Sequence, residues 1–314
     1  MSSFIAAGTS YAHFGINMIP FFIYYSMFGF QRIGDLIWAA ADIRSKGFLL
    51  GATAGRTTLN GEGLQHQDGH SQLAASAVPT LSAYDPAFAY ELATIVWDGL
   101  RRMYVEGEEL FYYLTLYNEN MPMPAMPEGC RQGILEGLYK FQAGPSGMKR
   151  RAHLLGSGPL IQEALAAQKI LAERYKVSAD VWSATSYKRL RAGALETRRW
   201  NMLHPTAQPK QSYLESILQL EKGVFVAVSD YMRSVPEQIA PWVPGGLFAL
   251  GTEGFGRSDS RANLRRFFEV DAPMTVIAVL YSLAQRGEFP PAEVEKAIRD
   301  LQVNPEKLHP ELLL

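Results

Sequence analysis

The 314-residue sequence has a single cysteine, Cys130, and no excess of either charge, with 30 Lys and Arg against 31 Asp and Glu. One cysteine excludes an internal disulfide and is typical of a reducing compartment, so we expect a cytoplasmic protein. The even charge balance provides no field that would attract nucleic acid or an anionic membrane. Partners must therefore be recognised by shape and local chemistry.

Long apolar runs are also missing. The most apolar stretch, residues 19–30, is closed by Arg32 and Asp35, well short of the roughly 20 apolar residues that a membrane helix requires. No basic segment precedes it, as one would in a signal peptide. We interpret the stretch as part of a core and expect no membrane association. Because apolar residues begin at Phe4, we expect the chain to start inside a domain.

Several common catalytic motifs are absent. No Gly-Lys-Ser or Gly-Lys-Thr is present for a P-loop, Gly156-Ser-Gly158 lacks the third glycine of a dinucleotide fingerprint, and no Gly-x-Ser-x-Gly elbow occurs. The sequence therefore does not support a P-loop kinase, a dehydrogenase with a dinucleotide-binding fingerprint or a serine hydrolase. At about 150 residues per domain, the length predicts two domains.

Short β-rich runs alternate with longer helical patterns, which predicts an α/β fold. The first block contains expected strands near residues 18–24, 48–52 and 110–116 and helices over 26–44 and 86–106. The second of these helices is expected to begin with Asp85 as N-cap and Pro86 at the first helical position. Since the strands are apolar throughout and the connections are helical, we expect a mainly parallel sheet covered on both faces.

Residues 142–151 form a break rich in Gly, Pro and basic residues, with no apolar period. We place the domain boundary there, which divides the chain into residues 1–143 and 150–314. The second block is a smaller α/β domain, with expected strands near 153–155, 180–184, 224–228 and 247–250 and helices near 160–175, 232–242, 263–268, 273–286 and 292–301.

The segment GRTTLNGEGLQHQDGHS (55–71) follows a predicted buried strand and contains four glycines, two histidines and both acidic residue types. Ligands of open α/β sheets bind at the carboxyl ends of strands, so this polar loop is a site candidate. A solvated loop with turn glycines is the alternative. His66 and His70, four residues apart, also raise the possibility of a zinc hydrolase. However, Gln67 replaces the glutamate of that motif, and Gly69 disfavours the helix it needs.

Two further segments carry candidates. Tyr25 and Phe28 lie where the first strand gives way to a helix, although aromatic residues at such spacing are more often core. Residues 251–260 form a second Gly-rich loop, interpreted mainly as structural, since Arg257, Asp259 and Arg261 could pair across an interface.

Six strings together resemble the homodimeric bacterial pyruvate dehydrogenase decarboxylase component, which uses thiamine diphosphate. The resemblance covers the chain from end to end. The strings are MIPFFIYYSMFGFQRIGD (18–35), residues 55–71, NEN (118–120), MPAMPEG (123–129), RWNMLHP (199–205) and LGTEGFGRSDSR (250–261).

The resemblance implies a transketolase-like architecture. Residues 1–143 would be an N-terminally truncated pyrimidine-binding domain, and residues 150–314 the transketolase C-terminal-like domain. By position, Tyr25 and Phe28 match aromatic residues that line the aminopyrimidine pocket, and Glu62 and His66 match polar residues that face cofactor and substrate.

The resemblance also implies what these residues do not contain. The family's catalytic glutamate would lie just upstream of Met1, and the diphosphate domain with its magnesium ligands would lie outside the chain. Expected partners are pyruvate, the lipoyl acetyltransferase component, and either a second copy or an N-terminal polypeptide. The chain alone is expected to be inactive as a decarboxylase. The alternative is a non-catalytic dimerisation or assembly module derived from such an enzyme.

Overall fold

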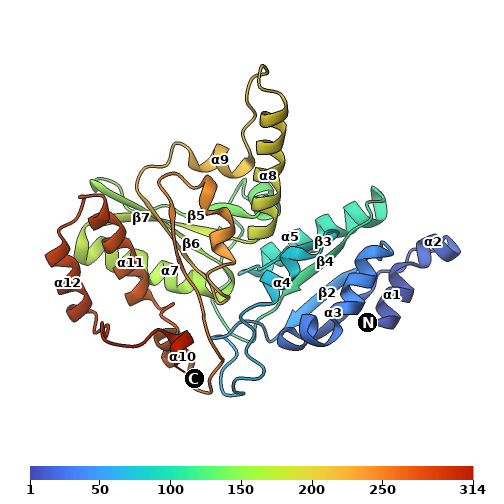
Figure 1. Cartoon of the computed structure of the whole chain (residues 1–314), viewed down its shortest axis with the longest axis horizontal. Coiled ribbons are helices and arrows are strands. Elements are labelled where there is room, and N and C mark those ends of the chain that lie inside the picture. Colours follow the sequence, from blue (N-terminus) through green and yellow to red (C-terminus); the bar gives the residue numbers. More distant parts are fainter. Residues whose placement is uncertain (314) are drawn as a thin grey trace.

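Two largely parallel sheets form the framework of the computed structural model, which describes residues 1–313. The first sheet has the strand order β1-β2-β4-β3, and the second has the order β5-β7-β6-β8-β9. Figure 1 shows the two α/β units side by side, with the segment between β2 and α4 running between them. The predicted α/β class is confirmed.

The first sheet consists of β1 (Phe21–Tyr25), β2 (Phe48–Ala52), β3 (Leu81–Tyr84) and β4 (Phe111–Thr115), and every strand pair in it is parallel. The short strand β3 was not predicted. The helices of this unit are α1 (Ser2–Gly8), α2 (Ser10–Phe14), α3 (Ser26–Asp42), α4 (Ser71–Ala77), α5 (Ala89–Leu100) with the π-helical η1 (Arg101–Val105), and α6 (Arg131–Glu136).

Helices cover both faces of the first sheet, as its apolar strands predict. On one face, Ile37 of α3 packs in a buried cluster with Leu49 of β2. On the other, Ile95 of α5 and Ile134 of α6 join a cluster with Phe48 of β2. Neighbouring residues of one strand thus point to opposite faces, which follows from the two-residue period of a strand.

The second sheet has four parallel strands and one antiparallel edge strand, β5. Its strands are β5 (Leu138–Gln142), β6 (Arg150–Gly156), β7 (Val177–Ala184), β8 (Val224–Val228) and β9 (Leu247–Leu250). The helices of this unit are η2 (Gly158–Leu160), α7 (Ile161–Ile170), η3 (Leu171–Tyr175), α8 (Tyr187–Leu203), α9 (Tyr213–Leu218), η4 (Pro236–Trp242), α10 (Arg261–Phe267), α11 (Ala272–Gln285), α12 (Pro291–Asp300) and η5 (Pro310–Leu312).

The boundary predicted at residues 143–150 falls inside the second unit. Strand β5 pairs with β7, with Leu138 opposite Ala184, so the chain changes sheets between β4 and β5. The Gly/Pro-rich segment instead joins β5 to β6, two strands that flank β7. Such segments serve as connections within a sheet as readily as linkers between domains, and composition alone does not separate the two.

Two helix predictions also need correction. Helix α5 begins after Phe88, and the carboxylate of Glu91 accepts hydrogen bonds from the backbone N–H groups of Ala87 and Phe88. Asp85 is not its N-cap: its carboxylate accepts from the hydroxyl of Thr115. The helix predicted over 232–242 is a 3₁₀ helix from Pro236 to Trp242. Its prolines have no N–H to donate to an α-helical bond.

One helical stretch, Arg261–Gln285, is long and apolar enough to cross a membrane by length and composition alone. More than half of its most apolar window is buried in the fold. It is divided into α10 and α11, and α11 packs against α7 and β8. A core helix passes the same test, so this finding is only weak evidence for a span.

Candidate functional site

The loop of residues 53–70 leaves the carboxyl end of β2 beside the carboxyl end of β1, because Tyr25 and Ala52 are partners in the parallel ladder. Gly61 and Gly63 have φ angles of 80° and 85°, which side chains other than glycine's rarely tolerate. These glycines allow the loop to fold back over the end of the sheet, where ligands bind in open α/β folds.

Three of the four predicted site residues form an aromatic cluster at this point. The ring centroids of Tyr25 and His66 are 5.4 Å apart, and those of Phe28 and His66 are 5.1 Å apart in an edge-to-face arrangement. Tyr25 is 44% exposed. The guanidinium of Arg32 lies 4.0 Å from the centroid of Phe28. The cluster therefore presents aromatic surface to solvent at the end of the sheet.

Glu62, the fourth predicted residue, lies beside the imidazole. Its Oε2 is 3.6 Å from Nδ1 of His66, which is too long for a hydrogen bond. Nδ1 of His66 is buried and has no hydrogen-bond partner. The imidazole is thus held by its ring contacts and by its backbone, and a small movement would bring Glu62 into contact with it.

The loop is anchored to the first unit by Asp68, which is fully buried. Its Oδ1 accepts from the backbone N–H groups of His70 (3.0 Å) and Ser71 (2.9 Å). Its Oδ2 accepts from the hydroxyls of Ser26 (2.5 Å) and Ser71. Since Ser26 directly follows Tyr25, the carboxylate connects the two segments that supply the aromatic cluster.

The second unit also holds the loop, through Asp230 in the segment after β8. Its carboxylate accepts from the backbone N–H and the hydroxyl of both Thr57 and Thr58, over distances of 2.7 to 3.0 Å. Burial raises the pKa of Asp230, while the threonine bonds oppose the rise. Four donors around one carboxylate bind the two units together next to the site.

Two more contacts join this loop to residues 251–260. Arg56 donates to the carbonyl oxygen of Thr252 (2.6 Å). The side chain of Gln67 donates to the carbonyl of Leu59 (2.6 Å) and accepts from the backbone N–H of Arg257 (2.6 Å). Both Arg56 and Gln67 are buried. Two buried side chains of the loop thus hold it against residues 251–260.

The loop of residues 251–260 makes part of the interface contacts expected of it. Arg261 donates to the backbone carbonyls of Thr58 and Asn118 in the first unit, which is a contact across the interface. Asp259 instead accepts from Ser260 and Asn263 at the start of α10.

A cavity of about 280 Å³ lies between the loop of residues 53–70 and the loop of residues 251–260, on the side of α3. Its lining residues are Met27, Gln31, Arg56, Leu64, Gln67, His70, Met232, Glu253, Gly254, Phe255, Gly256 and Glu311.

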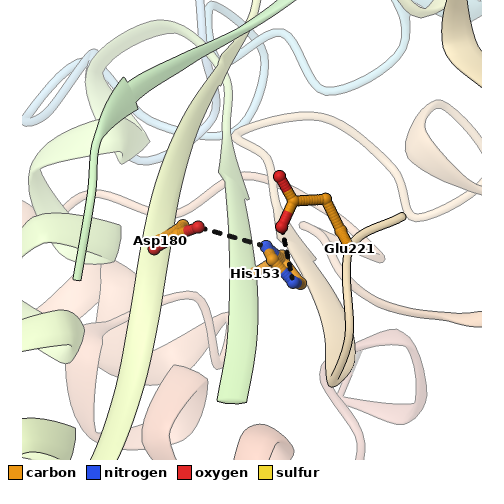
Figure 2. A group of neighbouring side chains, drawn as sticks. All are labelled: His153, Asp180 and Glu221. Atoms are coloured by element: carbon orange, nitrogen blue, oxygen red, sulfur yellow. Dashed lines mark ion pairs between the residues drawn. The ribbon is translucent and has the colours of Figure 1, made fainter. Parts of the chain in front are cut away.

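The zinc hypothesis for His66 and His70 finds no support in the geometry. The Gln31 amide donates to Nε2 of His70 (2.7 Å), and His66 faces the aromatic pair. Within residues 1–313, the grouping with metal-ligand spacing is a different one, His153, Asp180 and Glu221. Figure 2 shows His153 on the sheet between the two carboxylates.

That second cluster already contains its own cations. Nζ of Lys140 lies 2.9 Å from Asp180 and 2.6 Å from Glu221. Both nitrogens of His153 are also engaged, because the Trp182 indole donates to Nδ1 and Nε2 donates to the carbonyl of Lys222. Burial lowers the pKa of His153. We therefore interpret the cluster as a buried polar network that stabilises the second sheet.

Sequence comparison identifies two family models along the chain. Residues 1–124 match the pyruvate dehydrogenase E1 component middle domain, and residues 137–271 match the transketolase-like TK C-terminal domain. The gap between the two matches contains the change of sheets seen between β4 and β5.

Curated relatives are similar over almost the whole chain. The pyruvate dehydrogenase E1 component of Pseudomonas aeruginosa is 52% identical over 99% of this chain, and that of Escherichia coli K12 is 50% identical over 99%. The component of Mycobacterium tuberculosis is 49% identical over 99%. The chain spans about a third of the length of these relatives, 35%, 35% and 34%.

Solved structures agree on the fold. Transketolase from Leishmania mexicana superposes with a TM-score of 0.66 at 18% identity, over 87% of this chain and 35% of that one. A split-gene transketolase, solved as an inactive β4 tetramer, gives a TM-score of 0.61 at 18% identity, over 89% of this chain and 80% of its own. The chain has a transketolase-like fold and corresponds, over almost its whole length, to the middle and transketolase C-terminal-like domains of pyruvate dehydrogenase E1 components.

Proposed function

We propose that this chain forms the aminopyrimidine side of a thiamine diphosphate site in an enzyme that decarboxylates pyruvate. The observation that carries the proposal is the cluster of Tyr25, Phe28 and His66 at the carboxyl ends of β1 and β2. Aromatic surface beside one imidazole suits a flat heteroaromatic ring that carries polar substituents. The relatives named above are E1 components of pyruvate dehydrogenase.

The residues present suit one part of the cofactor. Tyr25 and Phe28 offer ring faces for stacking, and the Arg32 contact on Phe28 is worth only about 0.5–1 kcal/mol at an exposed site, so a ligand ring could displace it. The diphosphate and its magnesium ion have no such match in this loop. Asp68, its buried carboxylate, already accepts four hydrogen bonds. We place the magnesium ligands in polypeptide outside this chain.

Bound thiamine diphosphate would supply the nucleophilic carbon and the electron sink that decarboxylation of a 2-oxo acid requires. The chain's own residues would hold the substrate beside it. His66 lies at the edge of the aromatic pair, where its imidazole can donate to a pyruvate oxygen or hold a proton during the reaction. Glu62, 3.6 Å from Nδ1, would stabilise the protonated imidazole. Tyr25 and Phe28 would exclude water from the ring.

The finer parts of the proposal follow from the family. The product would be passed to the lipoyl group of an acetyltransferase component, which feeds acetyl-CoA synthesis. Assembly would be with a second copy or with an N-terminal polypeptide, in the cytoplasm. The single buried cysteine agrees with a reducing compartment.

A non-catalytic dimerisation or assembly module is the second candidate. The split-gene transketolase of similar extent, with its inactive tetramer, favours it, as do exposed apolar residues around β1, Phe14, Ile16, Met18, Phe21 and Ile23. Both candidates predict association, so association does not separate them. Cofactor binding does, because an assembly module has no reason to retain the aromatic pocket.

The discriminating experiment measures binding of thiamine diphosphate with Mg²⁺ by calorimetry. The samples are the chain mixed with a polypeptide that covers the rest of a relative, and the same mixture with Phe28→Ala. The control is Trp97→Ala, an exposed aromatic on α5. We expect binding that Phe28→Ala weakens at least tenfold and Trp97→Ala leaves unchanged. Absence of binding in the assembled mixture would favour the assembly module.

A further inference from the structure

The His66 imidazole has little of its own to hold it in place. Nδ1 has no hydrogen-bond partner, and the loop before it contains two glycines at positive φ. Ordering each residue of such a loop costs about 1–2 kcal/mol of conformational entropy. Contacts made by neighbouring residues must therefore fix the separation of His66 from Tyr25 and Phe28.

Asp68 makes the contacts that can do this, and of its two oxygens only Oδ2 reaches a residue outside the start of α4. Oδ1 accepts from the backbone N–H groups of His70 and Ser71, which begin α4. Oδ2 accepts from the hydroxyl of Ser26, which lies in the chain between Tyr25 and Phe28. Ser26 is almost fully buried. Oδ2 also accepts from the Ser71 hydroxyl, so this oxygen connects the start of α4 to the segment that carries both aromatic residues.

We propose that Asp68 is a positioning residue, and that its hydrogen bond to Ser26 sets the placement of the His66 imidazole against Tyr25 and Phe28. Its importance for catalysis rests on the proposed function, but the placement itself does not. A purely structural role, in which Asp68 only orders the start of α4, would rest on its bonds with His70 and Ser71 and leave Ser26 without effect on His66.

The test compares Ser26→Ala with Ser71→Ala. Both remove one hydroxyl that donates to Oδ2 of Asp68, but only Ser26 belongs to the aromatic segment. The readout is the NMR shift of the His66 ring protons in the isolated chain, assigned with His66→Gln. Aromatic rings about 5 Å away displace the chemical shifts of these protons from their random-coil values, because rings at such centroid distances are in contact.

We expect Ser26→Ala to remove more than half of this displacement and Ser71→Ala to keep most of it. Asp68→Asn is the second variant, because its amide keeps one oxygen for the two backbone donors but replaces the acceptor of Ser26 by an NH₂ group, to which the serine hydroxyl can bond only by accepting. It should change the His66 shift in the same direction as Ser26→Ala, by a smaller amount, in a chain whose amide spectrum remains folded. An unchanged His66 shift in both Ser26→Ala and Asp68→Asn would overturn the proposal. Failure of cofactor binding would count against the proposed function alone, since this readout needs no cofactor.

Discussion

At the scale of single residues, buried carboxylates organise the parts of this chain that lack regular structure. Asp68 and Asp230 hold the site loop, and Glu91 accepts from Tyr139 and Ser183 as well as from the start of α5. Each is surrounded by hydrogen-bond donors, which offsets part of the cost of burying a charge. What remains of that cost is visible as raised pKa values for Asp230 and Glu91.

Asp85 is the buried carboxylate whose effect on stability can be measured most directly. Burial raises its pKa from 3.8 to about 6, against the bonds from Thr115 and Tyr117. The folded state therefore binds a proton that the unfolded chain releases, so stability is lost as the pH rises from about 4 to 6. The shift corresponds to about 3 kcal/mol, at about 1.4 kcal/mol per pKa unit.

Asp85→Asn should accordingly flatten the pH dependence of the unfolding free energy between about pH 4 and 6. Denaturant unfolding at closely spaced pH values measures this slope. Asp259→Asn is the control, because Asp259 is an exposed carboxylate in the loop of residues 251–260. A slope in Asp85→Asn equal to that of the unsubstituted chain would contradict the assignment.

His66 provides the second prediction at this scale. His66→Ala in the assembled enzyme should lower kcat by about 10²–10⁴-fold, the usual cost of losing a positioned proton-transfer group. The unfolding free energy should change by less than about 1 kcal/mol, because a partly exposed loop side chain contributes little packing. His204→Ala, an exposed histidine that follows α8, is the control. Unchanged turnover with a large loss of stability would show that His66 is structural.

The geometric rule that parallel strands end at the same edge of a sheet placed Tyr25, Phe28 and the loop of residues 55–71 at one crevice. The choice of Glu62 and His66 within that loop came from the family resemblance. In the structure His66 contacts both aromatic rings, and Glu62 lies beside the imidazole. The contacts that hold the loop were not predictable in the same way. Asp230 lies 173 positions from Thr57, and hydrogen bonds over such separations leave no period in the sequence.

At the scale of elements, continuous apolar strands could be predicted, and elements with interrupted or polar sequences could not. Strands β2 and β4 are continuous apolar runs, typical of a parallel sheet covered on both faces. Strand β3, LSAY, is interrupted by a serine and gives no apolar run, whereas the equally short β9, LFAL, is apolar throughout and was predicted. Helix α8 was missed because its sequence is largely polar, with few apolar positions to indicate a buried face.

Helix α8 nevertheless connects the two units through Lys188. Its ammonium donates to the backbone carbonyls of Ala75, Val78 and Leu81, around the end of α4 and the start of β3. Removing the donor leaves three carbonyls without this partner, which should cost roughly 2–4 kcal/mol. We expect Lys188→Met to lower the unfolding free energy by this amount.

Thermal and denaturant unfolding of Lys188→Met checks the element-scale prediction. Lys169→Met, at an exposed position on α7, tests for a general effect of losing a lysine and should change stability by less than about 0.5 kcal/mol. Equal stability of Lys188→Met and the unsubstituted chain would show that the three carbonyls find other partners.

At the scale of the whole molecule, the first unit exposes apolar surface along its edge. Within residues 1–313, β1 pairs only with β2, and Phe21 and Ile23 of this edge strand are exposed together with Ile16 and Met18. A contiguous apolar edge of this kind marks an interaction surface. We therefore expect the chain to associate, as a dimer or a larger assembly, and sedimentation at several concentrations measures this. A monomer at high concentration would contradict the expectation.

On the proposed function, the chain would supply one part of a composite active site. Tyr25 of β1 and Phe28 of α3 provide aromatic surface, and the loop of residues 53–70 provides an imidazole and the exposed carboxylate of Glu62. The magnesium–diphosphate contacts are placed elsewhere. Affinity for the cofactor and activation of its reactive carbon would then both be deficient in the chain alone. The resemblance implies that the proton-transfer group, the family's catalytic glutamate, is not among these residues, and losing one such group costs about 10²–10⁴-fold in rate. Loss of the binding energy of the magnesium–diphosphate contacts adds to this deficit.

Carbon dioxide release from pyruvate tests this account most directly. The assay contains the 314-residue chain, thiamine diphosphate, Mg²⁺ and an artificial electron acceptor, with and without a polypeptide that covers the remaining part of a relative. The account predicts no turnover above background from the chain alone and clear turnover on mixing. Turnover by the chain alone at the rate of an intact relative would contradict it, as would an assembled mixture that binds pyruvate and cofactor but releases no carbon dioxide.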